Sequence, residues 1–452
     1  MITLNNSIYF GNNISSFNNN EPIFDIESMY AYDTHTAQIT TFDSKETLKL
    51  KEILKNFDQD LNNVILNKKK ISFVNDLIEN EILLENNRII TFGKMKNASV
   101  WLQSNHACNL ACPGCSTGMD IKQTVTKNMS EDVLRSCINK IAENAIKKGF
   151  QKVNIKLGGG EPTIRGRKWI EEVSKIINEV KFLHPYIDID ITLLSNGILV
   201  NDSMYDVLYQ NNIECVISTD PSRVFPKVNI PTIGLVLNNI QKLKAKGIKV
   251  TAQLTIGSHN AEDVIKIHKK LTDMEVSITW SLFRPNSKEQ YVERCNTDTI
   301  LAALKKIYSY TYDKITNNEF YGNIIDFDYL GVDVVKDGVC GAGKNYIVLD
   351  YNGDVYSCTE KMEINNGEKI NILESKDNVF DIISKVHEVP MELRYTKNIQ
   401  SDYKFKWQSG LGCPWVIKKE NDSYNNQSNY MTKIYEELMP ILIGLNIYYK
   451  KL

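Results

Sequence analysis

The sequence lacks the features that mark membrane-spanning, secreted and nucleic-acid-binding proteins. No apolar run approaches the roughly 20 residues that a transmembrane helix needs, and the best candidate, residues 439–449, is interrupted by Pro440 and is expected to be a packed C-terminal helix. The first residues, 1–6, have no basic start and no apolar core, so we expect no signal peptide and a cytoplasmic protein. The formal net charge of −2 provides no positive surface, so we expect neither nucleic acid nor a membrane as a partner.

The sequence also offers no disulfide framework, because cysteines in a reducing compartment rarely pair. Of its nine cysteines, six fall into two groups that are described below. Cys137 lies on the apolar stripe of a predicted helix that begins after Ser130, so we assign it to the core. Cys215 alternates away from Ser218 along a predicted strand and is also expected to be packed. Cys295 lies in a polar stretch and is the remaining cysteine available for chemistry.

The composition is that of a globular protein with ample core. Apolar residues make up 42% of the chain and charged residues 24%, and 452 residues are enough for two or three domains. We predict three units, at residues 1–95, 96–310 and 311–452.

The first unit is poor in glycine and proline. Residues 29–33 and 37–42 predict a hairpin, residues 47–57 and 71–80 predict two helices, and residues 81–92 predict a second hairpin or wing. This order resembles the winged-helix-like element that precedes peptide-modifying enzymes and binds a leader peptide as an added strand. A structural cap without binding function is the alternative.

The second unit alternates between apolar strands and amphipathic helices. We predict strands at residues 98–103, 153–157, 187–194, 213–218, 250–256 and 277–283. Six β/α units in series imply a parallel sheet with right-handed crossovers. A partial (β/α)6 TIM-like barrel is the natural closure, and an open sheet is the alternative. Ligands of such α/β folds bind at the carboxyl ends of the strands.

Three cysteines follow the first of these strands. Cys108, Cys112 and Cys115 have the spacing C-x3-C-x2-C, which differs from the C-x2-C pairs of zinc ribbons. Cysteine thiolate is the usual ligand of iron–sulfur clusters. With three ligands, one iron of a [4Fe–4S] cluster stays open for a substrate or cofactor. A three-cysteine zinc site is the alternative.

Together with Gly159, Gly160 and Glu161 after the next strand, this loop resembles the radical S-adenosylmethionine (SAM) superfamily. The resemblance covers residues 98–290. It implies that the three cysteines hold a [4Fe–4S] cluster whose open iron binds SAM, and that the Gly-Gly-Glu stretch binds the SAM amino group. Glycine permits close approach of the backbone, and a carboxylate accepts hydrogen bonds from an amino group.

Further polar residues lie at the predicted strand ends. The resemblance assigns SAM contacts to Ser195, Asn196, Ser218 and Asp220, and Gln253 lies at the same edge on the fifth strand. The superfamily usually has an aromatic residue directly before the third cysteine, and Gly114 stands there in this chain.

A second cysteine group follows in the third unit. Asn352-Gly353 predicts a hairpin between residues 346–350 and 354–358. Cys340, Cys358 and Cys413 resemble the auxiliary-cluster extension, SPASM or twitch, of peptide- and sugar-modifying radical SAM enzymes. The resemblance implies one auxiliary [4Fe–4S] cluster, with an open iron or a fourth ligand. A zinc knuckle or buried cysteines are the alternatives.

The candidates for catalysis are Cys295, Glu360 and Asp220. Cys295 is a candidate hydrogen-atom donor or cluster ligand, with an ordinary thiol as the alternative. Glu360 lies two residues after Cys358, near the position of the base in sulfatase maturases. Asp220 follows the fourth strand, and a structural role is its alternative.

The predicted function is that of a radical SAM enzyme. The resemblance implies reductive cleavage of SAM to a 5′-deoxyadenosyl radical, with electrons from a flavodoxin or ferredoxin. The preferred substrate is a ribosomally made precursor peptide, which is crosslinked, joined by a thioether or epimerised. A small-molecule dehydrogenase or cyclase and a non-catalytic iron–sulfur protein are the two alternatives.

Overall fold

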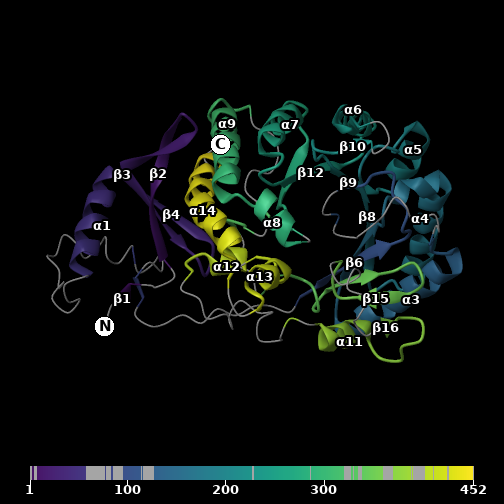
Figure 1. The fold of residues 1–452 in the computed structure, drawn as a ribbon. Helices are drawn as coiled ribbons and strands as arrows, with labels where there is room; N and C mark the ends of the chain where they lie inside the picture. The colour runs from purple at the N-terminus through teal and green to yellow at the C-terminus, as the bar shows by residue number, and fades with distance from the viewer. Residues whose placement is uncertain are drawn as a thin grey trace.

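The computed structural model describes residues 3–4, 8–57, 77, 83–84, 95–112, 115, 127–225, 229–285, 287–319, 327–328, 330–333, 338, 340–359, 370–387, 389, 403–410, 412–424 and 427–450. A long central sheet runs through these residues, with helices packed against it and a smaller N-terminal sheet at one end (Figure 1).

The N-terminal sheet is an antiparallel meander in the order β2-β3-β4. Its strands are β2 (Ile8–Asn18), β3 (Glu21–Asp33) and β4 (Gln38–Phe42), and α1 (Ser44–Phe57) packs against β3. The predicted hairpin and first helix are confirmed, since β3 and β4 pair from Met29↔Phe42 to Asp33↔Gln38. Strand β2 was not predicted. The second predicted helix and the wing lie largely outside the described residues, apart from Leu77 and the short pair β1 (Thr3–Leu4) and β5 (Leu83–Leu84).

The central sheet contains the six predicted strands, all parallel. They are β6 (Asn97–Gln103), β7 (Lys152–Gly158), β8 (Asp188–Ser195), β9 (Glu214–Ser218), β12 (Val250–Ile256) and β13 (Ser277–Leu282). The described sheet is open, because β13 is at one end of the strand order β13-β12-β9-β8-β7-β6-β14-β15-β16 and β16 is at the other. The parallel core and its carboxyl edge are therefore as predicted.

Helices connect these strands and bury apolar faces against them. They are α3 (Glu131–Lys148), α4 (Gly166–Leu183), α5 (Asp202–Gln210), α6 (Ile233–Ala245) and α7 (Ala261–Asp273). Helices α8 (Lys288–Arg294) and α9 (Thr297–Thr316) follow the last of these strands. The connections also contain the 3-10 turn η2 (Pro162–Arg165) and the short antiparallel pair β10 (Val224–Phe225) and β11 (Ile230–Pro231). Ser130 caps α3 as predicted, because its side chain accepts a hydrogen bond from Val133 N, and Cys137 is fully buried.

The hairpin predicted around Asn352-Gly353 extends the central sheet. Strand β14 (Tyr346–Leu349) pairs in parallel with β6, and β15 (Asp354–Tyr356) and β16 (Ile370–Asn371) follow antiparallel. Helix α11 (Val379–Val386) packs against α3. The third unit is thus joined to the second through backbone hydrogen bonds.

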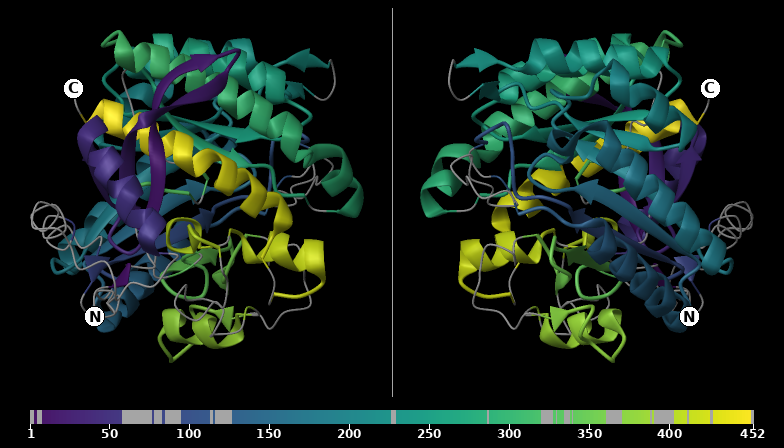
Figure 2. Two further views of the ribbon diagram at one scale, coloured as in Figure 1. Left: turned by 90° about the vertical axis from the view of Figure 1, so that its left-hand side faces the viewer. Right: turned by 90° about the vertical axis from the view of Figure 1, so that its right-hand side faces the viewer.

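The C-terminal helices lie between the two sheets. They are α12 (Lys406–Ser409), α13 (Pro414–Asn421) and α14 (Asn429–Tyr449), and α14 crosses beside the N-terminal strands (Figure 2). Gly444 packs on Ile14, and the Tyr448 hydroxyl donates to the Ile14 carbonyl at 2.7 Å. The predicted C-terminal helix is confirmed, and no helix of the described chain is long and apolar enough to cross a membrane.

Candidate active site

The three-cysteine loop leaves the carboxyl end of β6 and contains three partly buried thiols. Burial, with smaller effects from the nearby Glu161, Cys112 and Cys115, raises the pKa of Cys108 to about 12, although a hydrogen bond from Leu110 N opposes the rise. The three thiols are therefore close enough to interact. Burial also raises the pKa of Cys112.

These thiols fit a bound iron–sulfur cluster. Thiols whose pKa is raised stay protonated without a cation, and iron is the cation that holds cysteine as thiolate in such clusters. Among the described residues, no three His, Cys, Asp or Glu side chains are arranged to hold a single metal ion.

The glycine stretch after β7 packs directly on this loop. Gly160 N donates to Asn105 O at 3.0 Å, Glu161 N donates to Ala107 O at 2.8 Å, and Asn105 Nδ2 donates back to Glu161 O at 3.0 Å. A methyl group on Gly160 would overlap the Ala107 carbonyl, and Gly159 has a φ of 143°. Only glycines allow the two segments to approach this closely.

Glu161 joins three loops at the carboxyl edge of the sheet. Its side chain is almost fully buried, and its Oε1 accepts hydrogen bonds from Thr163 N at 3.1 Å, from the Thr163 hydroxyl and from the Ser195 hydroxyl at 2.8 Å. Its Oε2 accepts one from Asn196 N at 2.7 Å. Burial raises the pKa of Glu161, and these donors oppose that rise. The carboxylate therefore already has four donors from its own chain.

The predicted SAM-binding pair Ser195 and Asn196 lies beside the cysteine loop. Asn196 Nδ2 donates to Asn109 Oδ1 at 2.8 Å, between Cys108 and Cys112. Both residues are buried. The structure thus brings this pair together with Glu161 and the three-cysteine loop.

The other predicted residues lie at the ends of β9 and β12. Asp220 accepts hydrogen bonds from Ser222 N at 3.0 Å and from Asn260 Nδ2 at 3.1 Å, and it lies near Cys112, whose pKa it raises. Gln253 Nε2 donates to Ser281 Oγ at 3.2 Å. Ser218 ends β9 and is half-buried.

Three basic residues at this edge were missed from the sequence. Arg223 hydrogen-bonds the Cys112 thiol and lowers its pKa, and His259 and Arg294 lie against Phe283, with His259 5.1 Å from its ring centre and Arg294 5.4 Å from it. Arg223 and His259 come shortly after the ends of β9 and β12, which was the available signal, whereas Arg294 is the last residue of α8 and had none. Among the described residues, nothing hydrogen-bonds the buried Nε atoms of the two arginines or Nδ1 of His259. Such nitrogens could hydrogen-bond to a polar ligand bound at the carboxyl edge of the sheet.

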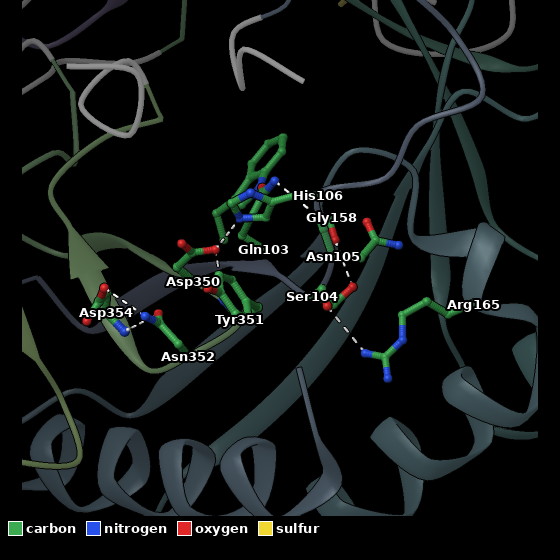
Figure 3. Close-up of polar contacts among 11 residues, drawn as sticks. Gln103, Ser104, Asn105, His106, Gly158, Arg165, Asp350, Tyr351, Asn352 and Asp354 are labelled. Carbon is green, nitrogen blue, oxygen red and sulfur yellow. Dashed lines mark hydrogen bonds and ion pairs between the residues drawn. The ribbon is translucent and has the colours of Figure 1, made fainter. Parts of the chain in front are cut away.

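A part-buried pair that the sequence did not reveal joins the start of the three-cysteine loop to the hairpin of β14 and β15 (Figure 3). His106 Nε2 lies 2.6 Å from Asp350 Oδ1, which also accepts from Tyr351 N at 2.8 Å. His106 comes two residues before Cys108, and Asp350 directly follows β14. The hairpin of the third unit therefore contacts the start of the three-cysteine loop.

The second cysteine group converges around two tyrosines. Burial raises the pKa of Cys340 to about 11, and the nearby Cys413 raises it further. Burial raises the pKa of Tyr346, with smaller effects from Cys358 and Cys340, and raises that of Tyr424 to about 12, with Cys358 and Cys413 adding to it. Cys340, Cys358 and Cys413 thus share one neighbourhood.

Of the remaining catalytic candidates, the structure describes Cys295 but not Glu360. Cys295 directly follows α8 and lies in the apolar core, where burial raises the pKa of its thiol to about 11 although a hydrogen bond with the Tyr430 side chain opposes the rise. Its sequence context was polar, but Tyr430 and α14 cover it from a distant part of the chain. Glu360 and Gly114 lie outside the described residues.

Comparison with known proteins agrees with this geometry. Residues 102–271 match the family model of the Radical SAM superfamily. No curated protein matches the chain.

Solved structures with a similar fold include native anSMEcpe with bound AdoMet, at 18% identity and a TM-score of 0.61, covering 78% of this chain and 100% of that one. A complex of anSMEcpe with AdoMet and the Kp18Cys peptide has 19% identity and a TM-score of 0.62, covering 78% and 99%. Streptococcus suis SuiB bound to precursor peptide SuiA has 16% identity and a TM-score of 0.48, covering 95% and 99%.

The matched residues contain the end of β6, the parallel strands β7, β8, β9 and β12, the three-cysteine loop and the glycine stretch that packs on it. Over residues 102–271, the chain is therefore similar to the Radical SAM superfamily.

Proposed function

We propose that this radical SAM enzyme modifies a ribosomally made precursor peptide and carries one auxiliary [4Fe–4S] cluster. The observation that supports SAM chemistry best is the contact between the three-cysteine loop and the Gly159–Glu161 stretch at the carboxyl edge of the parallel strands. When bound, the cluster and SAM supply a 5′-deoxyadenosyl radical that removes a hydrogen atom from the substrate.

The chain's own residues hold and orient these groups. Cys108, Cys112 and Cys115 are the ligands of the SAM-binding cluster. Gly159 and Gly160 expose their backbone beside that loop, where the SAM amino group would find acceptors. Glu161 fixes the ends of β7 and β8 relative to each other through its four hydrogen bonds.

The rest of the edge contributes polar contacts and exclusion of water. Ser195, Asn196, Ser218 and Gln253 are the proposed SAM contacts, with Asp220 as a further contact or a base. Their burial or half-burial limits access of water to a reactive species.

The second cysteine group would hold the auxiliary cluster. Cys340, Cys358 and Cys413 are its proposed ligands, and the chemistry of three thiols gathered around Tyr346 and Tyr424 fits that role. Cys295 and Glu360 remain proposed catalytic residues.

A peptide substrate is supported by two observations. The anSMEcpe fold, which resembles this one, has been solved with the Kp18Cys peptide. In addition, β4 is an edge strand of the N-terminal sheet, where within the described residues it pairs only with β3. An extended peptide can add to such an edge through backbone hydrogen bonds. A crosslink, a thioether or an epimerised residue would be the product, with a flavodoxin or ferredoxin as electron donor.

The test uses full-length protein reconstituted anaerobically with iron and sulfide. With dithionite and SAM it should form 5′-deoxyadenosine, and Cys112→Ala should not. A short peptide encoded beside the gene should then change in mass and stimulate this turnover. Formation of 5′-deoxyadenosine no faster than in Cys112→Ala would overturn the enzymatic proposal, and turnover without any peptide product would overturn its peptide part.

A further inference from the structure

A cleft of about 550 Å³ lies between the N-terminal sheet and the C-terminal helix. Strands β2 and β3 form one wall, and α9 and α14 form the other. These elements lie side by side in both views of Figure 2. None of the residues assigned above to SAM or to a cluster lines this cleft.

The lining of the cleft is acidic. The lining residues include three carboxylates, Glu21, Glu436 and Glu437, and one cation, Lys305, whose Nζ lies 2.7 Å from Glu21 and 3.8 Å from Glu437. Within the described chain, no residue forms an ion pair with Glu436. Two negative charges therefore remain uncompensated in the cleft.

Pro440 leaves a backbone carbonyl of α14 without its usual helical donor. Proline has no N–H, so the carbonyl of Glu436, four residues earlier in α14, lacks the donor that a helix normally provides. Both residues line the cleft. The helix wall thus combines two carboxylates with a backbone oxygen that needs a donor.

The opposite wall is aromatic. Tyr9, Phe24 and Tyr30 line it, and Lys404 already lies 5.7 Å from the ring centre of Tyr9. Aromatic faces attract cations. Gly11 keeps the wall open beside Tyr30, because a methyl group there would overlap the Tyr30 hydroxyl.

We propose that this cleft binds a lysine or arginine side chain of the peptide substrate. Such a side chain offers the apolar stem that packs on the aromatic wall and the N–H donors that the acidic helix wall lacks. In the protein without peptide, Lys305 interacts with Glu21 and Glu437 and therefore competes with the peptide side chain for these carboxylates. The inference rests on the peptide part of the proposed function and concerns a site outside the reaction centre.

The test selects ligands from an mRNA-display library of linear 12-residue peptides on the full-length reconstituted protein. Bound sequences should be enriched in Lys and Arg at one position by threefold or more. Glu436→Gln/Glu437→Gln should abolish the enrichment, and Lys305→Met should increase it. The matched control is Glu171→Gln/Glu172→Gln, an equal change of charge at adjacent positions of α4, which should leave the enrichment unchanged.

The preferred peptide is then synthesised with norleucine in place of its Lys, or citrulline in place of its Arg, and the dissociation constant should rise about tenfold. Absence of a Lys or Arg preference, or one that survives loss of both glutamates, would overturn the inference. Formation of 5′-deoxyadenosine is measured in the same preparations without peptide. If 5′-deoxyadenosine forms but no Lys or Arg preference is found, the cleft inference alone fails. If no 5′-deoxyadenosine forms, the proposed function fails.

Discussion

Replacement of Glu161 by glutamine distinguishes a structural clamp from a direct contact with SAM. The two carboxylate oxygens serve different backbone donors, since Thr163 N lies 3.1 Å from Oε1 and Asn196 N lies 2.7 Å from Oε2. A glutamine side chain must place its NH2 group against one of these two N–H groups in either orientation. Neither backbone donor can turn away, so one buried N–H loses its partner.

The cost of that lost partner sets the expected size of the effect. A buried donor without an acceptor costs about 1–3 kcal/mol, which corresponds to local opening that is about 5- to 150-fold more frequent. Hydrogen exchange of the Thr163 or Asn196 amide should therefore accelerate by that factor in Glu161→Gln protein without SAM. Ser195→Ala removes a single hydroxyl donor and should have a smaller effect.

The control is Glu171→Gln, which removes a half-exposed ion pair with Arg167 and should leave both amides unchanged. Formation of 5′-deoxyadenosine is measured on the same samples. Unchanged exchange at both amides together with lost 5′-deoxyadenosine would refute the clamp and assign the carboxylate to SAM itself.

Three further predictions concern other buried groups. Burial lowers the pKa of His268 from 6.5 to about 4, so as pH falls the imidazole of the unfolded chain is protonated before that of the folded chain. About 3 kcal/mol of stability is therefore lost between pH 6.5 and pH 4. The stability of His268→Phe, measured by urea denaturation, should lack this part of the loss, and identical pH dependence of the two proteins would contradict the prediction. Asp350→Ala removes the acceptor of His106 and should alter the electron paramagnetic resonance spectrum of the reduced cluster at unchanged iron content, whereas an identical spectrum would contradict a positioning role. Cys358→Ser should lower iron by about four atoms per chain and spare 5′-deoxyadenosine formation, whereas Cys112→Ser should abolish it; full iron content in Cys358→Ser would exclude its role as a ligand.

The sequence predicted the elements whose signals are local. The six core strands are apolar runs bounded by turns, and α3 has both a capping serine and an apolar stripe. Asn352-Gly353 specified the hairpin between β14 and β15 through its turn chemistry. The three-cysteine motif could be recognised for the same reason, because its cysteines lie within one short segment.

The features that escaped prediction depend on partners far along the chain. Strand β2 is rich in Asn and Ser, and its buried residue Ile14 is covered by Gly444 in α14. His106 and Asp350 are 244 positions apart, and neither residue has a local pattern that identifies the other. The burial of Cys295 escaped prediction for the same reason, since its neighbours in sequence are polar and Tyr430 covers it from a distant part of the chain.

The parallel pairing of β14 with β6 has a consequence for how the two cysteine groups are related. Strand β6 leads into Cys108, and the hairpin that begins with β14 ends at Cys358, so both groups extend from adjacent strands in fixed register, with Leu349 opposite Leu102. Hydrogen bonds along this register resist sliding, and the His106–Asp350 pair adds a contact at the carboxyl end. A change in the separation of the two groups would break these bonds. This pairing therefore fixes the position of the start of the three-cysteine loop relative to the hairpin that leads to Cys358.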